Sequence, residues 1–481
     1  MTDSTHDGPS RRQVLKAAAA SALAGVVLPQ VHAAEDNTVR VALIGCGGRG
    51  TGAAENAMNV ARYGPVKLVA MADVFEDRLK ASYDQLQNTK VAKHVEVPAD
   101  RKFIGFDAYK HAMDCLKPGD VAIFTTPLAF RWVHFGYAIE KGLNVFMEKP
   151  LLADGPTAKK MFKLAEESEK KNMKVGVGLM CRHCVVRQEL FKKIKDGAIG
   201  DITLLRAYRV KGPEATQYSY KKDVQFPPKK ENGKEVVTPE LAYQIRRFHS
   251  FLWASGGSYN DFLIHNIDEC CWMKDAWPVE ARAIGGRHYR TGNRGEYVDQ
   301  NFDHYTVEYT FADGAKLMLE SRNIPGCWQA FASYAHGTKG SAIISSESHT
   351  PAHSRIFSGQ KMPIGRVPRR NEPDVTWKWE GGEREPDPYQ LEWDDLITAI
   401  RQDKPYNEVK RGTEASLISS MGRMAAHTGQ VVTRDQILND GQVFATDVDK
   451  LTSMDSPAPV QADKDGKYPV PEPGRKRMRE Y

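Results

Sequence analysis

The stretch that decides the fold reads Val39-Arg40-Val41-Ala42-Leu43-Ile44-Gly45-Cys46-Gly47-Gly48-Arg49-Gly50. Residues 39–44 form a nearly continuous apolar run, which is typical of a parallel strand buried on both faces. The glycines of Gly45-x-Gly47-x-x-Gly50 follow at once, and a helical pattern occupies residues 51–61. Glycines in this place predict a turn that lets a pyrophosphate approach the backbone at the start of a helix. The alternative is a tight strand–helix turn that holds no ligand.

The following sequence alternates strands with helices. We expect further buried strands at residues 66–72, 120–124, 144–147 and 175–178, and helices at 108–116, 130–141 and 157–171, with Asp107 as the N-cap of the first. This alternation predicts an α/β fold whose N-terminal part, residues 34–179, is a Rossmann domain with a doubly wound parallel sheet.

An acidic residue ends the second strand of this domain. Asp73 lies 23 residues after Gly50, where a carboxylate can accept hydrogen bonds from both ribose hydroxyls of a dinucleotide. A carboxylate there repels a 2′-phosphate, so NAD is favoured over NADP. In the alternative, Asp73 points away and Arg78 accepts the phosphate. Gly45, Gly47, Gly48 and Gly50 are expected to contact the cofactor, and Arg49 either contacts the pyrophosphate or is solvated.

Beyond residue 180 the pattern changes. Strands are expected at residues 202–210, 281–285, 304–310, 315–321 and 341–345, and helices at 391–401 and 413–427. Residues 211–239 and 350–388 are rich in Pro, Gly, Lys and Glu, and predict long surface loops or insertions over a cleft. We expect a second α/β domain at residues 180–450, with an open and mostly antiparallel sheet, followed by an extended tail at 451–481.

Composition excludes several classes of protein. The chain has 481 residues, of which 41% are hydrophobic and 27% charged, and its net charge of +6 comes from scattered residues rather than a basic cluster. This argues against a nucleic-acid partner. The sequence has no run of about 18 consecutive apolar residues, so no membrane span is expected. Seven cysteines are an odd number and too few for a disulfide scaffold in a chain of this length.

The N-terminus predicts export. Residues 1–33 contain Ser10-Arg11-Arg12, an alanine-rich stretch and Val31-His32-Ala33 before Ala34, which together resemble a twin-arginine signal. Val14 departs from that pattern, which usually has Phe there. The alternative is an amphipathic N-terminal helix. We expect a periplasmic or equivalent location, or a cytoplasmic one if the segment is not a signal.

A wider set of residues carries a family resemblance. The segment Glu148-Lys149-Pro150 ends a late strand, and it accompanies the glycine loop and Asp73. Further matches are Thr126-Pro127, His134, Gly197–Asp201, Gly256–Ser258, Asp261, His265, Asp268 and Gly422-Arg423. Together they resemble the glucose–fructose oxidoreductase, inositol dehydrogenase and rhizopine-catabolism (Gfo/Idh/MocA) oxidoreductases over nearly all of residues 38–435.

The resemblance implies hydride transfer between a nicotinamide and a secondary alcohol of a sugar, cyclitol or related polyol. It implies Lys149, Asp261 and His265 as the catalytic set. The expected cofactor contacts then include Thr126, Pro127, His134, Glu148 and Lys149, with Glu148 near the nicotinamide ribose. The open sheet of the second domain implies a homo-oligomer, a dimer or a tetramer.

The chemistry of these residue types agrees with that implication. Oxidation of an alcohol needs a base for the hydroxyl proton and a cation near the developing alkoxide. Lys149 ends a strand, where ligands of doubly wound sheets bind. Asp261 and His265 are four residues apart, so on a helix they share one face. His265 is the expected proton acceptor, and Asp261 could orient it or bind a substrate hydroxyl. An isolated Asp-x-x-x-His of this kind is often only structural.

Other clusters are assigned no chemistry. Cys181-Arg182-His183-Cys184 and the adjacent pair Cys270-Cys271 lack the spacing of a structural zinc site, so no metal is expected. Arg182 and His183 follow the last strand of the first domain and could line the substrate cleft. The tryptophans that could stack on a sugar are expected in the core: Trp253, Trp272, Trp277 and Trp328.

Two other functions fit the same residues. One is a glycosidase that uses bound NAD for oxidation, elimination and reduction, and the other is a ligand-binding relative without catalysis. A twin-arginine signal on a dinucleotide-binding protein further predicts that NAD is tightly bound and leaves the cytoplasm inside the folded chain. The mature N-terminal arm (residues 34–37) or the tail could provide the extra contacts.

Overall fold

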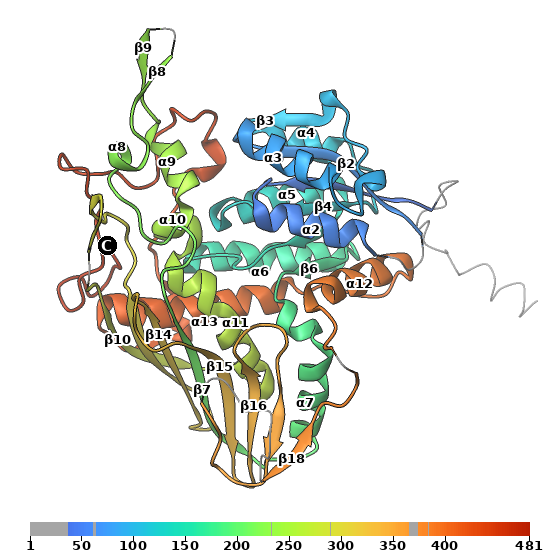
Figure 1. Ribbon diagram of the computed structural model, residues 1–481, viewed down its shortest axis with the longest axis vertical. Helices are drawn as coiled ribbons and strands as arrows, with labels where there is room; N and C mark the ends of the chain where they lie inside the picture. Colours follow the sequence, from blue (N-terminus) through green and yellow to red (C-terminus); the bar gives the residue numbers. More distant parts are fainter. Residues whose placement is uncertain (1–36, 61–63, 232, 289, 365–373, 383) are drawn as a thin grey trace, which may run out of the picture.

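The computed structural model describes residues 37–60, 64–231, 233–288, 290–364, 374–382 and 384–481. The expected signal segment, residues 1–33, lies outside the described residues. Figure 1 shows a unit of helices around a parallel sheet at the upper right and a large sheet at the bottom.

The N-terminal unit is the predicted Rossmann domain. Its six strands are all parallel and run in the order β3-β2-β1-β4-β5-β6. The strands are β1 (Val39–Ile44), β2 (Val66–Asp73), β3 (Lys102–Ile104), β4 (Val121–Phe124), β5 (Asn144–Met147) and β6 (Val175–Val177). The helices are α2 (Gly48–Met58), α3 (Glu76–Gln87), α4 (Ala108–Asp114), α5 (Arg131–Lys141) and α6 (Gly155–Lys170). Short 3₁₀ turns lie at Ala92–His94, Ala99–Arg101 and Leu128–Phe130.

Alternate residues of β1 explain why this sheet is covered on both faces. Val41 and Leu43 pack in one apolar cluster with residues of α2 and α3, while Ala42 and Ile44 pack in another with residues of α4, α5 and α6. A strand with two buried faces must be apolar throughout, which is the pattern that the sequence carries. Asp107 takes the expected N-cap position of α4, but its side chain makes no capping hydrogen bond.

The second unit contains a nine-stranded sheet in the order β18-β17-β16-β15-β7-β14-β13-β10-β19. The pair β7–β14 is parallel and the other pairs are antiparallel, so the predicted mostly antiparallel sheet is confirmed. The strands are β7 (Ile202–Lys211), β10 (Glu280–Gly286), β13 (His304–Thr310), β14 (Lys316–Asn323), β15 (Ala330–Gly337), β16 (Ser341–Ser346), β17 (Arg355–Phe357), β18 (Val375–Lys378) and β19 (Val432–Thr433).

Helices connect and cover this sheet, and α11 and α13 pack against it. They are α7 (Val185–Lys195), α8 (Lys222–Gln225), α9 (Glu240–Arg246), α10 (Leu252–Ser255), α11 (Gly257–Lys274), α12 (Pro388–Arg401), α13 (Val409–Thr428) and α14 (Arg434–Asn439). Further 3₁₀ turns lie at Met180–His183, Phe248–Ser250 and Val448–Lys450. Two small hairpins are β8 (Lys229–Glu231) with β9 (Lys234–Val236), and β11 (Thr291–Gly292) with β12 (Gly295–Glu296).

Three features differ from the sequence expectations. The strand β15 was not anticipated because its sequence, AFASYAHG, mixes alanines and aromatic residues with polar ones and has no clear alternation, yet it lies between β7 and β16 within the sheet. The presumed loop 211–239 contains the hairpin β8–β9, which projects at the top of Figure 1. The presumed loop 350–388 contains β17 and β18. Pairing with neighbouring strands gives these segments their structure, and local composition does not report that pairing.

One helix of the C-terminal half completes the Rossmann domain. Trp393, Leu396 and Ile400 of α12 are buried in the apolar cluster of β1 and α2, and the ring of Trp393 stacks on Phe146 of β5 at 4.5 Å. Figure 1 shows α12 beside this domain. The helix was expected at residues 391–401, but its partner sheet could not be read from the sequence.

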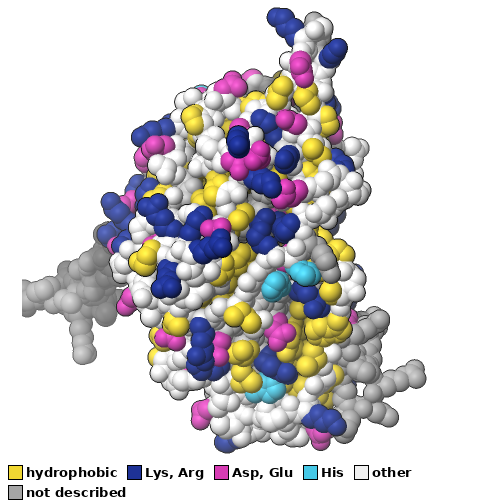
Figure 2. All heavy atoms as spheres, turned by 90° about the vertical axis from the view of Figure 1, so that its left-hand side faces the viewer, with side chains coloured by type: hydrophobic (Ala, Val, Ile, Leu, Met, Phe, Trp, Pro, Cys, Tyr) yellow, Lys and Arg dark blue, Asp and Glu magenta, His cyan; other side chains and the backbone are white. Residues whose placement is uncertain are grey.

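The surface carries mixed charge on the face shown in Figure 2, where Lys and Arg side chains lie among Asp and Glu. Within the described part of the chain, no helix is both long and apolar enough to cross a membrane.

Candidate active site

A cavity of about 520 Å³ lies where the Rossmann domain meets the second unit. Its walls include the glycine loop, the carboxyl ends of β2, β4 and β5, and residues of α11 and the segment before it. This edge of a doubly wound sheet is where such folds bind ligands. All of the expected catalytic and cofactor residues line it: Gly45, Gly47, Gly48, Arg49, Gly50, Asp73, Thr126, Pro127, His134, Glu148, Lys149, Asp261 and His265.

The glycine loop has the geometry of a phosphate cradle. Gly45 has a positive φ of 96°, and a Cβ at Gly50 would lie 2.1 Å from the carbonyl oxygen of Gly45 and 2.5 Å from Oγ1 of Thr125. The turn therefore requires glycine at both positions. A Cβ at Gly47 or Gly48 would meet nothing within 4 Å. These two residues thus leave open space at the N-terminus of α2, where backbone N–H groups favour an anion.

Asp73 is fixed at the end of β2. Its carboxylate accepts hydrogen bonds from the backbone N–H groups of Cys46 at 2.6 Å and Phe75 at 2.8 Å. Burial raises the pKa of Asp73, and these amides and the nearby Arg78 partly oppose that shift. A carboxylate has about four acceptor positions, so two remain for other donors in the cavity. Arg78 also lines the cavity, which keeps both readings of cofactor choice open.

The loop after β4 is held by a buried arginine. Arg131 donates to the carbonyl oxygens of Phe124 at 2.8 Å and Thr126 at 3.0 Å. His134 lies behind this loop, with Nδ1 3.4 Å from Oγ1 of Thr126. Burial and then the charge of Arg131 lower the pKa of His134 to about 3. His134 is therefore neutral and supports the wall of the cavity at Thr126-Pro127.

Arg49 is held by two carboxylates. Its Nε donates to Glu148 at 2.5 Å and its Nη2 to Glu392 of α12 at 3.3 Å, and its guanidinium lies 4.8 Å from the ring centre of Tyr389. Burial would lower the pKa of Arg49, but the two carboxylates outweigh burial and raise the pKa above its ordinary value. Arg49 thus links the glycine loop to the strand end that carries Glu148.

Lys149, Asp261 and His265 come together as expected. Nζ of Lys149 donates to the backbone oxygen of Asp261 at 2.5 Å and lies 3.5 Å from its Oδ1. The other carboxylate oxygen lies 3.3 Å from Nε2 of His249. Burial would raise the pKa of Asp261, but Lys149 and His249 outweigh it and lower the pKa to about 2. Asp261 is therefore ionised, with Lys149 on one side of its carboxylate and His249 on the other.

His265 is a neutral imidazole in this site. Burial lowers its pKa well below the usual value, and the charges of His349, Lys149 and Arg209 add to the effect. A neutral ring has a free lone pair and can accept a proton. The helix α11 holds Asp261 and His265 one turn apart, so both face the cavity.

Several residues of the site had no signal in the sequence. They reach the cavity from β7, from the 3₁₀ turn Phe248–Ser250, from the segment between β16 and β17 and from the start of α12, and they are Arg209, Phe248, His249, His349 and Tyr389. None stands in a motif, and two lie in or beside segments that composition marks as loops.

The assignment of Arg182 and His183 to the substrate cleft is not supported, since neither is among the described residues that line the cavity. Arg182 pairs with the buried Asp268 at 2.8 Å. His183 lies 2.7 Å from Asp395 and 3.3 Å from Glu408. Although burial lowers the pKa of His183, these acids raise it to about 10. Both side chains tie the 3₁₀ turn to helices instead.

The cysteines and two of the tryptophans singled out in the sequence can now be placed in the structure. All seven cysteines are free, and Cys181, Cys184, Cys270 and Cys271 are buried. Trp253 is fully buried, whereas Trp328 is 56% exposed and does not belong to the core.

A segment from the second unit closes the cavity on the side of Asp73. We call residues 240–250 the clamp. Arg246 of the clamp forms a two-bonded ion pair with Asp77 of α3, at 2.8 and 3.0 Å, and its guanidinium lies 3.9 Å from the ring centre of Phe75. Ile245 and Phe248 line the cavity. The clamp thus bridges the cavity next to the strand end that carries Asp73.

The tail braces the clamp from behind, and Figure 1 shows it beside α9 and α10. Gln244 donates to the carbonyl oxygen of Val460 at 2.7 Å, and Val460 and Tyr468 share one buried cluster with Phe130, which lines the cavity. The tail ends in a buried anchor, where Glu480 pairs with Arg423 at 2.8 Å.

Comparisons with known proteins support the fold. No protein-family model and no curated protein matches the chain. Levoglucosan dehydrogenase in complex with NADH has a TM-score of 0.60 at 17% identity, covering 83% of this chain and 100% of that one. Aldose–aldose oxidoreductase from Caulobacter crescentus, complexed with glycerol, has a TM-score of 0.57 at 16% identity, covering 82% and 99%. Myo-inositol 2-dehydrogenase from Lactobacillus plantarum has a TM-score of 0.56 at 21% identity, covering 82% and 99%. At these identities the likeness establishes the architecture alone.

Proposed function

We propose that this protein is an oxidoreductase of the Gfo/Idh/MocA type that transfers a hydride between a nicotinamide cofactor and a secondary alcohol of a sugar, cyclitol or related polyol. One observation carries the proposal: a single cavity joins the glycine loop and Asp73 to Lys149, Asp261 and His265. Dehydrogenases of sugars and inositol among the similar structures support it. The nicotinamide, when bound, accepts or donates the hydride.

The residues of this chain would handle the proton and the charge. Lys149 is a cation, held at 2.5 Å from a carbonyl oxygen, that can stabilise negative charge on a substrate oxygen. The neutral ring of His265 can take the hydroxyl proton. Asp261, ionised beside Lys149 and His249, orients Lys149 and can accept a hydrogen bond from a second hydroxyl.

The proposed cofactor is NAD rather than NADP. The carboxylate of Asp73 is fixed by two backbone amides beside the nucleotide end of the cavity, where it would accept from a ribose hydroxyl and repel a 2′-phosphate. Arg78 lines the same cavity as Asp73, and this observation favours NADP instead.

We also propose that NAD is retained during turnover. Retention through strong dilution needs a dissociation constant of about nanomolar or below, near −12 kcal/mol. The clamp would supply contacts that a glycine loop lacks, because it would have to separate from α3 before a nucleotide could leave on that side. The tail would act only by bracing the clamp, since none of its described residues lines the cavity. Such retention is what export of a loaded, folded protein requires, and the proposed location is periplasmic.

Retention would constrain the reaction. Each oxidation must then be followed by a reduction at the same site, either with a second carbonyl substrate or within one redox-neutral cycle. The second case includes a glycosidase that uses bound NAD for oxidation, elimination and reduction. The clamp supports this second candidate function, because such a cycle needs a cofactor that stays bound.

Two measurements test these proposals. The protein is purified without added nucleotide, denatured in acid, and the released nucleotide is quantified. Near-stoichiometric NAD supports retention, whereas empty protein that turns over only with added NAD refutes it and leaves an ordinary dehydrogenase. Sugars, sugar acids, cyclitols and aryl glycosides are then screened by nicotinamide absorbance and product analysis. Failure to bind either NAD or NADP would refute the oxidoreductase itself.

A further inference from the structure

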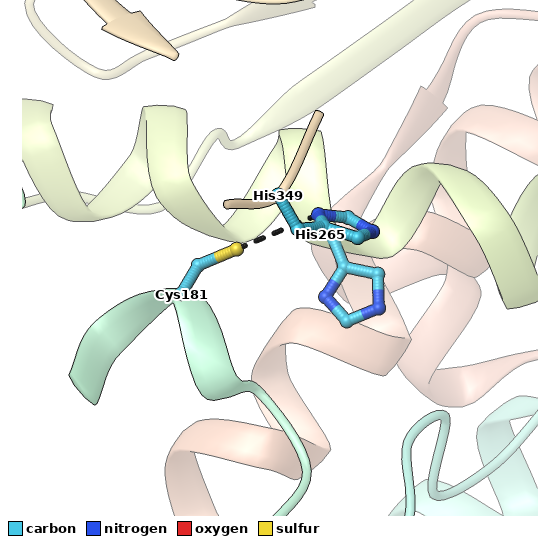
Figure 3. Close-up of side chains that lie close together, drawn as sticks. All are labelled: Cys181, His265 and His349. Atoms are coloured by element: carbon cyan, nitrogen blue, oxygen red, sulfur yellow. Dashed lines mark hydrogen bonds between the residues drawn. The ribbon is translucent and has the colours of Figure 1, made fainter. Parts of the chain in front are cut away.

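A cysteine and two histidines meet at the wall of the cavity (Figure 3). Cys181 comes from the 3₁₀ turn Met180–His183, His265 from α11, and His349 from the segment between β16 and β17. One potential ligand atom from each lies within 4.8 Å of the others. Sγ of Cys181 is 3.8 Å from Nδ1 of His349, and the centres of the two imidazole rings are 4.4 Å apart.

We propose that Cys181, His265 and His349 form a binding site for a thiophilic transition-metal ion of the zinc class, with its fourth coordination position open to the cavity. Three protein ligands and one open position distinguish catalytic zinc sites from closed structural ones. Thiolate and imidazole are the donors that zinc prefers. The ligand atoms must approach one another by about 0.3 Å to as much as about 1.4 Å to reach tetrahedral bonding geometry.

The imidazole of His265 has a ring nitrogen that is free to bind a metal ion. Nδ1 of His265 is buried and has no hydrogen-bond partner within the part of the chain that the structure describes. A buried polar atom without a partner is costly, and a metal ion would satisfy it. Burial, and then neighbouring positive charge, lowers the pKa of both His265 and His349. Both rings are therefore neutral in the empty site, and the same burial and positive charge that disfavour a proton also oppose a metal cation.

The thiol must lose its proton when the ion binds. Burial raises the pKa of Cys181 despite the opposing charge of Arg187, so the empty site holds a thiol. Metal binding forms the sulfur–metal bond, breaks the S–H bond and releases that proton to solvent. The site then carries one negative charge from sulfur and two neutral rings.

Positive side chains surround the cluster, and they are the main cost to a dication. Four cations are paired with three carboxylates, since Glu214 pairs with two of them, and this pairing reduces their field at the site without cancelling it. The pairs are Lys149–Asp261 (3.5 Å), Arg187–Glu269 (2.8 Å), Arg209–Glu214 (3.0 Å) and Lys211–Glu214 (3.2 Å). Nη1 of Arg209 also lies 3.4 Å from Nε2 of His349, so this guanidinium must turn away when Nδ1 of His349 binds the ion.

The place of the site gives it a role. His265 and His349 line the cavity, and Cys181 lies behind them, so the open position faces the space beside Lys149. A water molecule or a substrate oxygen could occupy it. An ion on Nδ1 of His265 would leave the ring proton on Nε2, so His265 accepts the hydroxyl proton only in the metal-free site. In the loaded site His265 would be a donor, and the metal would hold the substrate oxygen. The site itself does not depend on the proposed reaction.

The test measures metal content directly. The full chain is stripped with a chelator, equilibrated with Zn²⁺, and separated from free metal before elemental analysis. We expect about one zinc per chain, and at least about 100-fold weaker binding in Cys181→Ser, because loss of a ligand exceeds the 10–100-fold effect of losing a supporting residue. Cys184→Ser is the matched control, since Cys184 is equally buried, three residues away and outside the cluster, and it should bind zinc as the wild type does.

Cobalt substitution adds a structural readout. Co²⁺ in the wild type should give a thiolate-to-metal charge-transfer band that Cys181→Ser loses and Cys184→Ser keeps. His349→Ala, on another segment of the chain, should also lose zinc while circular dichroism stays unchanged. Equal zinc in the wild type and Cys181→Ser would overturn the site. NAD binding is measured on the same samples: protein that binds NAD but no metal refutes only the metal site, and protein that binds metal but no nucleotide refutes only the proposed function.

Discussion

Replacing Glu480 by glutamine is expected to lower the free energy of unfolding by about 3 kcal/mol at pH 7. The carboxylate accepts from Nη2 and Nε of Arg423 at 2.8 and 2.9 Å and from Nδ1 of His427 at 2.6 Å. Arg423 and His427 are fully buried, and Glu480 is 2% exposed. Glutamine keeps the shape but leaves the charge of Arg423 without a counter-charge, and breaking one partner of a buried pair costs about 3–5 kcal/mol.

The pKa of Glu480 gives a similar magnitude. Burial would raise it, but Arg423 and His427 outweigh burial and lower the pKa from 4.5 to about 2. Each pKa unit corresponds to about 1.4 kcal/mol, so this shift is also about 3 kcal/mol. Because the folded-state pKa is the lower one, the contribution is present above about pH 4.5 and is lost as the pH falls towards 2.

Thermal unfolding measures this effect. The unfolding entropy of a chain of this length is roughly 1 kcal/mol per kelvin, so the melting temperature should fall by about 3 °C at pH 7 if the chain unfolds as one unit. The difference between wild type and variant should shrink below about pH 4.5. Glu472→Gln is the control in the same tail, because its ion pairs with Arg475 and Lys476 are exposed, at 3.9 Å each. An unchanged melting temperature in Glu480→Gln, or an equal loss in the control, would refute the role of the anchor.

Three further predictions concern the cofactor. Gly50→Ala should weaken NAD binding and also destabilise the protein by about 1–3 kcal/mol, because its Cβ would lie 2.1 Å from a backbone oxygen. Gly47→Ala should weaken NAD binding alone, because its Cβ meets open space. Melting curves recorded with and without NAD separate the two effects. Asp73→Ser should reduce the preference for NAD over NADP by about tenfold, or 1.4 kcal/mol, in titrations of both nucleotides, and a wild type that binds both equally would contradict the assignment. Arg246→Gln should speed NAD dissociation by about threefold to fivefold, since a partly exposed ion pair contributes up to about 1 kcal/mol. Stopped-flow fluorescence measures the dissociation rate, with Lys80→Gln as the surface control. An unchanged rate would show that the clamp does not retain NAD.

The sequence by itself determined the local parts of this protein. Residues 39–50 specify a buried strand, a tight turn and a helix start, because apolar periodicity and glycine sterics act over a few residues. The same holds for Asp73 at a strand end and for the spacing of Asp261 and His265 on one helix. The glycine loop and Asp73 could be assigned to one site because the carboxyl ends of parallel strands meet at one edge of a sheet, whereas Asp261 and His265 were assigned to it through the resemblance to a known family.

Only the tertiary structure decided which distant segments complete the site. The clamp, the brace from the tail, the pairing of α12 with the Rossmann sheet, and the meeting of His349 with Cys181 join residues far apart in the chain. Arg182 and His183 differ from these residues: their position in the sequence suggested the cleft, but carboxylates of Asp268, Asp395 and Glu408 hold them elsewhere. Such contacts depend on packing and on charge pairing across the fold, and neither periodicity nor spacing along the chain encodes them.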